Sequence, residues 1–67
     1  MMTGVVQFFL EDKGYGYIRV LETREEFFVP RRELRQPIER GMRVQFRLRE
    51  NKQGFYAAEV SAIAGAQ

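Results

Sequence analysis

The sequence predicts a small all-β domain of five strands, built as an antiparallel barrel or as a strongly coiled sheet. Five segments rich in β-branched and aromatic residues follow one another, and mostly short polar turns separate them. The chain has 67 residues, which allows one domain over residues 1–67 with an ordered core of about residues 3–63. Closing so small a sheet into a barrel removes the exposed strand edges that would otherwise favour aggregation.

We expect strands over residues 4–10, 15–21, 26–31, 42–49 and 55–63. Pro30 closes the third strand, because proline fits only an edge or the end of a strand. The one long connection, residues 32–41, contains Pro37 and therefore leaves room only for a single helical turn over residues 32–36. The tail, residues 64–67, has nothing to hold it and should fray.

The fourth strand shows the clearest alternation of apolar and polar residues. Its inward side chains are Met42, Val44, Phe46 and Leu48, and its outward side chains are Arg43, Gln45, Arg47 and Arg49. Residues 31–67 carry eight basic side chains against four acidic ones, whereas residues 1–30 carry three against five. Arginine outnumbers lysine by nine to two, which favours planar recognition of phosphate or stacking on bases. We interpret the arginine row as a solvated face that attracts phosphate, not as a second specific site.

The second and third strands direct aromatic rings toward solvent. Ile18 and Val20 make the better core pair in the second strand, which leaves Tyr15 and Tyr17 outward. The third strand turns Phe27 and Val29 inward and Phe28 outward in the same way. Three outward rings on adjacent strands form a patch, with Lys13 and Arg31 near the strand ends. Stacking surfaces for single-stranded nucleic acid are built in this manner, although rings favoured in strands can also simply cover a core from outside.

Composition excludes several classes of function. The chain contains no cysteine and no histidine, so it lacks disulfides, thiolate metal sites and the usual acid–base group at neutral pH. No apolar run approaches the 18 residues of a membrane span, and we expect no export leader before the domain. We therefore expect a cytoplasmic binding module that is not an enzyme, with no cofactor, no metal and no membrane partner.

Alternation alone does not decide which phenylalanine of the first strand is buried. Strict alternation groups Phe8 with Val6 and Phe9 with Val5, so either phenylalanine could be the buried one. A bulge in this strand would reverse the answer.

Five ordered segments resemble the bacterial cold-shock domain family. The segments are Gly4–Phe9 (GVVQFF), Lys13–Ile18 (KGYGYI), Phe27–Val29 (FFV), Glu39–Phe46 (ERGMRVQF) and Gly54–Val60 (GFYAAEV). The resemblance covers residues 3 to about 63 and implies an oligonucleotide-binding (OB) barrel that holds single-stranded RNA or DNA on an aromatic face. It implies that Phe8 is exposed with Phe9 buried behind it, and that Tyr15, Tyr17 and Phe28 stack on bases with Lys13 at their edge.

The chain departs from the family pattern at the edge of the implied site. Pro30 stands in place of a stacking histidine and Arg31 in place of a phenylalanine, so guanidinium groups partly replace rings. Tyr56 replaces a polar residue and adds a ring, and Lys52 joins Lys13 and Arg31 in flanking the aromatic face. Glu59 replaces an asparagine, which the sequence does not explain.

The leading interpretation is a single-stranded nucleic-acid-binding protein, acting as an RNA chaperone or a cold-shock-type regulator. The expected partner is single-stranded RNA or DNA, and the protein is expected to be a monomer or a weak homodimer. The alternative is a barrel used as a protein-interaction module, with the aromatic patch facing another chain. Salt dependence separates the two, because only nucleic-acid binding should weaken steeply with salt.

Overall fold

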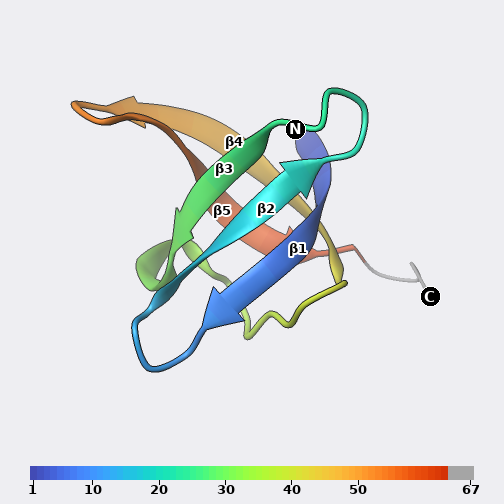
Figure 1. Cartoon of the computed structure of the whole chain (residues 1–67), viewed down its shortest axis with the longest axis vertical. Coiled ribbons are helices and arrows are strands. Elements are labelled where there is room, and N and C mark those ends of the chain that lie inside the picture. Colours follow the sequence, from blue (N-terminus) through green and yellow to red (C-terminus); the bar gives the residue numbers. More distant parts are fainter. Residues whose placement is uncertain (64–67) are drawn as a thin grey trace.

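The computed structural model describes residues 1–63, which form a closed barrel of five strands (Figure 1). The strands are β1 (Met2–Leu10), β2 (Tyr15–Val20), β3 (Glu26–Pro30), β4 (Arg43–Asn51) and β5 (Gly54–Ala62). A short 3-10 turn, η1 (Arg31–Glu33), follows β3 and is shorter than the helical turn expected over residues 32–36. The predicted fold class is confirmed, and the tail of residues 64–67 lies outside the described residues.

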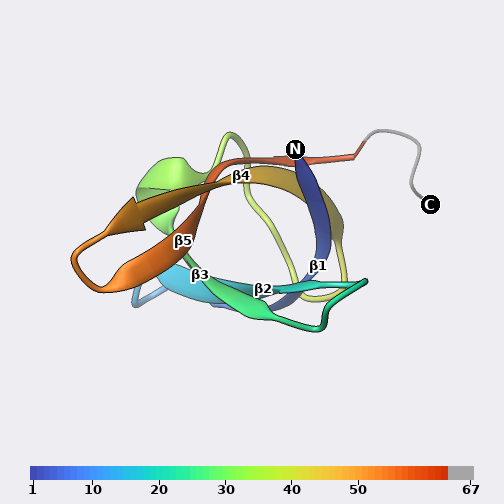
Figure 2. The same cartoon turned by 90° about the horizontal axis from the view of Figure 1, so that it is seen from above.

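The strands pair in the order β1-β2-β3-β5-β4. The expected antiparallel pairing joins β1 to β2, β2 to β3, β1 to β4 and β4 to β5. The barrel closes differently, because β3 and β5 run parallel where Phe28 lies opposite Tyr56. A second parallel bridge joins Leu34 to Val60 just beyond η1. Figure 2 shows this side of the barrel, where η1 lies against β5.

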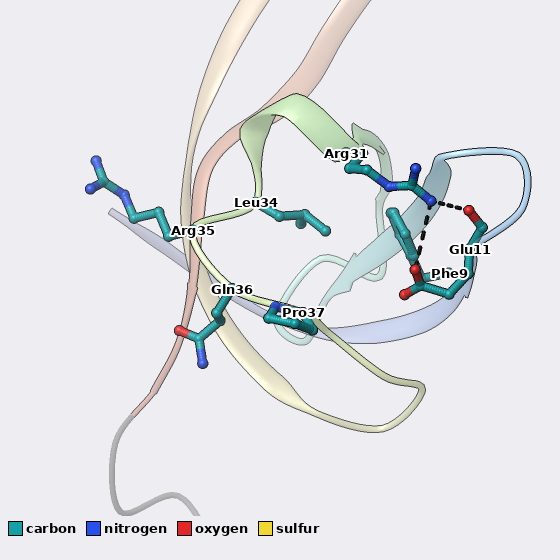
Figure 3. Close-up of a pocket in the computed structure, with 7 residues that line it drawn as sticks. All are labelled: Phe9, Glu11, Arg31, Leu34, Arg35, Gln36 and Pro37. Atoms are coloured by element: carbon teal, nitrogen blue, oxygen red, sulfur yellow. Dashed lines mark hydrogen bonds and ion pairs between the residues drawn. The ribbon is translucent and has the colours of Figure 1, made fainter.

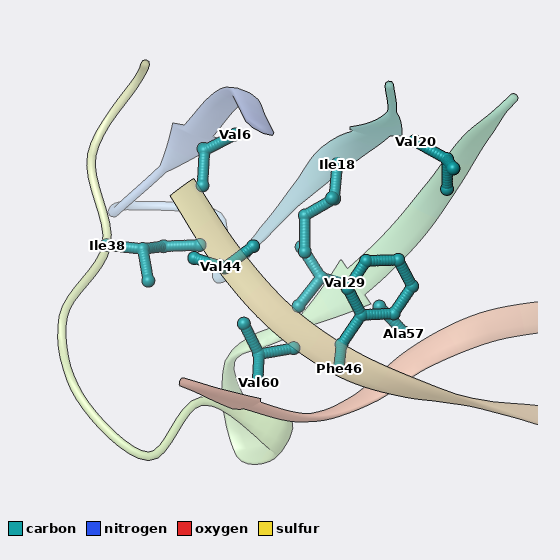
Figure 4. Packing of buried hydrophobic residues seen from close by; sticks show 9 residues of the cluster. All are labelled: Val6, Ile18, Val20, Val29, Ile38, Val44, Phe46, Ala57 and Val60. Atoms are coloured by element: carbon teal, nitrogen blue, oxygen red, sulfur yellow. The ribbon is translucent and has the colours of Figure 1, made fainter. Parts of the chain in front are cut away.

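The core fills the inside of the barrel with side chains from every strand (Figure 4). The inward side chains predicted from alternation are confirmed as buried or as packed against the buried cluster. They are Ile18, Val20, Phe27, Val29, Met42, Val44, Phe46 and Leu48. Phe46 is the largest fully buried side chain among the described residues, and its ring centroid lies 6.4 Å from that of Phe27.

A bulge in β1 decides which of its two phenylalanines faces solvent. The register with β2 shifts between Val6 and Phe8, so strict alternation fails at Gln7. Val6 is buried, Phe8 is 38% exposed, and Phe9 packs against the core. The exposure of Phe8 implied by the family resemblance is therefore confirmed.

Candidate nucleic-acid interface

Four aromatic rings lie together on the outer faces of β1, β2 and β3, which run side by side in Figure 1. We name this set the aromatic platform: Phe8, Tyr15, Tyr17 and Phe28. Strand register accounts for the grouping, because Tyr17 lies directly opposite Phe8 on one side and Phe28 on the other. Directly opposed residues project from the same face of a sheet, so three adjacent strands deliver rings to one surface.

The rings of the aromatic platform touch one another and remain open to solvent. Ring centroids are 5.6 Å apart for Phe8 and Tyr17, 5.6 Å for Tyr15 and Phe28, and 6.0 Å for Tyr17 and Phe28. Phe8 and Phe28 are each 38% exposed, and both tyrosines are half-buried. The ring planes are tilted by 28° to 76° to one another, so they present several separate faces and edges. Such a surface can accept flat, unpaired bases by stacking.

Tyr56 continues the line of rings onto β5, across the parallel pairing of β3 with β5, which we call the parallel seam. It lies opposite Phe28 in the β3–β5 pairing, so it projects from the same side of the sheet. The guanidinium carbon of Arg32 lies 5.7 Å from its ring centroid, within range of a cation–π interaction. Sequence reasoning did not include Arg32. It lies in η1, and the parallel pairing of β3 with β5 that brings it to Tyr56 has no local signal in the sequence.

A hollow of about 240 Å³ lies where the platform meets the β4–β5 hairpin. Its lining residues are Tyr17, Phe28, Asn51, Gln53, Gly54, Phe55 and Tyr56. The hairpin extends away from the barrel in Figures 1 and 2, and Phe55 is 56% exposed on it. The amide side chains of Asn51 and Gln53 add hydrogen-bonding groups to an otherwise aromatic site, a combination that suits a nucleobase.

The predicted basic residues lie at different distances from these rings. Lys13 is exposed in the β1–β2 turn, two residues before Tyr15, and Lys52 is exposed at the tip of the β4–β5 hairpin. Arg31 reaches instead toward the β1–β2 turn, where it donates a hydrogen bond to the carbonyl of Glu11 and lies 3.6 Å from its carboxylate. Figure 3 shows this contact beside Phe9, at a hollow that these residues line together with the loop over residues 34–37. Arg31 is therefore held by Glu11 and is not stacked among the platform rings.

The family model of the 'Cold-shock' DNA-binding domain matches residues 2–63, nearly the whole chain. The chain belongs to the cold-shock domain family. This family is a nucleic-acid-binding module, which agrees with the exposed aromatic platform on a closed barrel. A comparison with curated proteins finds no match.

Two positions at the edge of the platform lack the rings that the family resemblance implies there. Pro30 is buried opposite Tyr15 and so offers no ring to solvent at the position of the family's histidine. Arg31 is turned toward Glu11 at the position of a phenylalanine. The ring of Tyr56 and the exposed ring of Phe55 extend the aromatic surface at its other end.

The far edge of the β1–β3 face carries an acidic side chain held in place by two partners. Arg19 donates a hydrogen bond of 2.8 Å to the Glu26 carboxylate, and Gln7 donates one of 3.1 Å. These contacts, led by the hydrogen bond from Arg19, lower the pKa of Glu26 below its ordinary value. Glu26 therefore stays ionised at neutral pH and forms an ion pair with Arg19 at the end of the face away from Lys13.

The described part of the chain shows neither a membrane-crossing helix nor a metal-binding group. Within residues 1–63 no helix is long and apolar enough to cross a bilayer. The same residues contain no group of three or more metal-binding side chains placed to hold an ion.

Proposed function

We propose that this domain binds single-stranded RNA or DNA by stacking unpaired bases on the aromatic platform, and that it acts as a cytoplasmic RNA chaperone. The observation that carries the proposal is the contiguous set of exposed rings, with centroids within about 6 Å of one another, on one face of a cold-shock barrel. A base stacked on one ring contributes roughly 1–3 kcal/mol, so a few rings give useful affinity with little sequence preference.

The flanking groups have separate roles in this proposal. Tyr56 accepts a base at the hollow beside the hairpin, while Lys13 and Lys52 follow the phosphates at opposite ends of the platform. Arg31 contributes to binding only if a phosphate of the strand displaces the Glu11 carboxylate from its guanidinium group, because the two anions compete for that group.

Chaperone action follows from the geometry without a catalytic step. A duplex hides the flat faces of its bases inside the stack, so the platform can bind only strands that have opened. Binding the open form pulls the folding equilibrium of an RNA toward unpaired strands by mass action. The domain then needs neither an energy source nor an acid–base group.

The test is fluorescence anisotropy with labelled single-stranded and double-stranded oligonucleotides of the same sequence. We expect binding to the single strand to be at least about tenfold tighter. Equal affinity for the duplex would contradict the proposal. A hairpin labelled with a fluorophore and a quencher tests the chaperone role directly. Added protein should lower its melting temperature, and a protein that binds the strand without lowering that temperature is not a chaperone.

A further inference from the structure

A group of charged side chains lies on the outer side of β4 and β5, next to the strands that carry the aromatic platform. Three arginines surround the carboxylate of Glu59, and we name them the arginine cluster: Arg35, Arg47 and Arg49. Arg35 Nη2 lies 3.3 Å and Arg47 Nε lies 3.5 Å from Oε1 of Glu59, while Arg49 Nη2 donates a hydrogen bond to Oε2. Alternation in the fourth strand predicts Arg47 and Arg49 on its outer face, but it says nothing of Arg35.

The backbone fixes Glu59 at the centre of this cluster. The β4–β5 register shifts between Gln45 and Arg47, and Glu59 takes a positive φ of 52° at the same irregularity. Its N–H donates to the carboxylate of Glu33 at 3.1 Å, and Arg35 is anchored by an N–H to carbonyl bond of 2.9 Å to Val60. Asparagine tolerates this backbone conformation better than glutamate does. What glutamate supplies at this position is a carboxylate that pairs with three arginines.

One carboxylate leaves the arginine cluster with excess positive charge. Counting the neighbouring Arg32 and Glu33, four arginines face two glutamates. The Glu59 side chain is only 29% exposed, whereas the three arginine side chains are 50% to 62% exposed. Each guanidinium has five N–H donors and spends few of them on Glu59, so the outward donors can bind another anion.

Tyr56 connects this charge to the aromatic platform. It lies opposite Phe28 on the β3 side and opposite Arg49 on the β4 side, so all three project from one continuous surface. Arg47 is itself exposed and lies opposite Ala58, a fully buried residue two positions further along β5. The half of the chain that builds the platform, residues 1–30, is by contrast net acidic. A strand on the rings therefore meets additional positive charge beyond Tyr56.

Building on the function proposed above, we propose that the arginine cluster is a phosphate-binding extension of the site. A single strand that leaves the platform over Tyr56 places two or three phosphates on Arg35, Arg47 and Arg49, in competition with the Glu59 carboxylate. The ligand class is an extended single-stranded polynucleotide, too long to be held by the rings alone.

The test compares labelled pyrimidine oligonucleotides of 6 and 12 nucleotides by anisotropy titration over a range of salt. The longer strand should show a steeper slope of log affinity against log salt, by roughly 1.4–2.1 for two or three added phosphates. Between 50 and 200 mM salt this corresponds to a further loss of affinity of about sevenfold or more. The double substitution Arg35→Gln/Arg47→Gln should remove most of the difference while leaving binding of the short strand unchanged.

Two further variants keep the test decisive. Arg40→Gln/Arg43→Gln removes the same charge from exposed positions outside the cluster and should leave the extra slope in place. Glu59→Gln removes the competing anion and should tighten binding of the long strand only. Equal slopes for both strands, equal effects of the two arginine pairs, or no gain from Glu59→Gln in a folded protein would overturn the inference. Failure of the short strand to bind at all would instead overturn the proposed function.

Discussion

Two adjacent phenylalanines in β3 show how much one residue of register decides. Phe28 is 38% exposed and contacts Tyr15 and Tyr17, whereas its neighbour Phe27 packs against the core beside Phe46. The two side chains are identical, so the pleat of the strand alone determines that one ring meets solvent and the other meets the core. The proposed division between binding and stability therefore rests on strand position.

Removing a platform ring should weaken binding without unfolding the domain. Tyr17→Ala and Phe28→Ala should each reduce the affinity for single strands by roughly 1–3 kcal/mol, the usual contribution of one base–ring stack. Melting should change little, because Phe28 is exposed and Tyr17 is half-buried. Oligonucleotide titration and thermal melting on the same variants provide the check.

The matched control removes a buried ring. Phe46 is fully buried, so Phe46→Ala should cost about 3–5 kcal/mol of unfolding free energy, close to the whole stability of so small a domain. If Phe28→Ala unfolded the protein while Phe46→Ala stayed folded and lost binding, the assigned faces would be wrong.

The ion pair of Arg19 and Glu26 should make part of the domain's stability depend on pH. The hydrogen bond from Arg19 holds the pKa of Glu26 below its ordinary value of 4.5 in the folded state. Its contribution to stability is therefore fully present above about pH 4.5 and is lost as the pH falls through the lowered folded value. Glu26→Gln should reduce the drop in melting temperature between pH 5 and pH 3. Glu22→Gln, an exposed residue in the next turn, is the control and should leave that drop unchanged.

The two strands of the β1–β2 hairpin approach each other closely at Gly16. Gly16 lies opposite Phe9, and a Cβ atom at position 16 would lie only 2.8 Å from the Cα of Phe9 and closer still to the carbonyl oxygen of Phe8. These are backbone atoms at the β1 bulge, so no side-chain rotation relieves the clash. The same bulge turns Phe8 outward, which links this glycine to the platform.

Gly16→Ala should therefore destabilise the domain by about 1–3 kcal/mol, since the two strands must separate to admit the methyl group. The melting temperature, followed by circular dichroism, should fall by at least about 4 °C. Binding by the remaining folded protein should also weaken, because Phe8 and Tyr17 shift relative to one another. An unchanged melting temperature would mean that the strands do not approach as closely as described.

The strands and their faces could be predicted from the sequence because alternation is a local signal. Ile18, Val20 and Val44 are buried, as the alternation of their neighbours in the sequence predicts. The bulge at Gln7 was not predictable, since it depends on how β1 bends to pair with both β2 and β4. Only the family resemblance placed Phe8 outward.

Long-range side-chain partners were not accessible to sequence reasoning either. Arg31 contacts Glu11, which lies 20 positions away in the sequence. Glu59 contacts arginines from β4 and from the loop after η1. Such partners are set by the closed barrel and leave no local pattern. The choice of Phe8, Lys13, Tyr15, Tyr17, Phe28, Arg31, Lys52 and Tyr56 as nucleic-acid contacts stays a prediction.

For the whole molecule, salt should report how many phosphates the platform neutralises. If Lys13, Lys52 and their neighbours contact two to four phosphates of a short strand, the slope of log affinity against log salt should be about −1.4 to −2.8. Lys13→Gln/Lys52→Gln should make that slope shallower by roughly 1.4. A slope near zero would favour a protein-interaction module, because an aromatic protein interface responds little to salt.

The parallel seam between β3 and β5 has a consequence for where the barrel opens locally. Its described strand pairing is a single opposed pair, Phe28 and Tyr56, with the Leu34–Val60 bridge beyond it, so the seam should be the first part to open. Amide protons there should exchange with solvent faster than those between β1 and β2. A base stacked across Phe28 and Tyr56 would hold both sides of the seam together. Hydrogen exchange should therefore slow at the seam when a single strand binds. The bound strand would then stabilise the closed barrel against local opening.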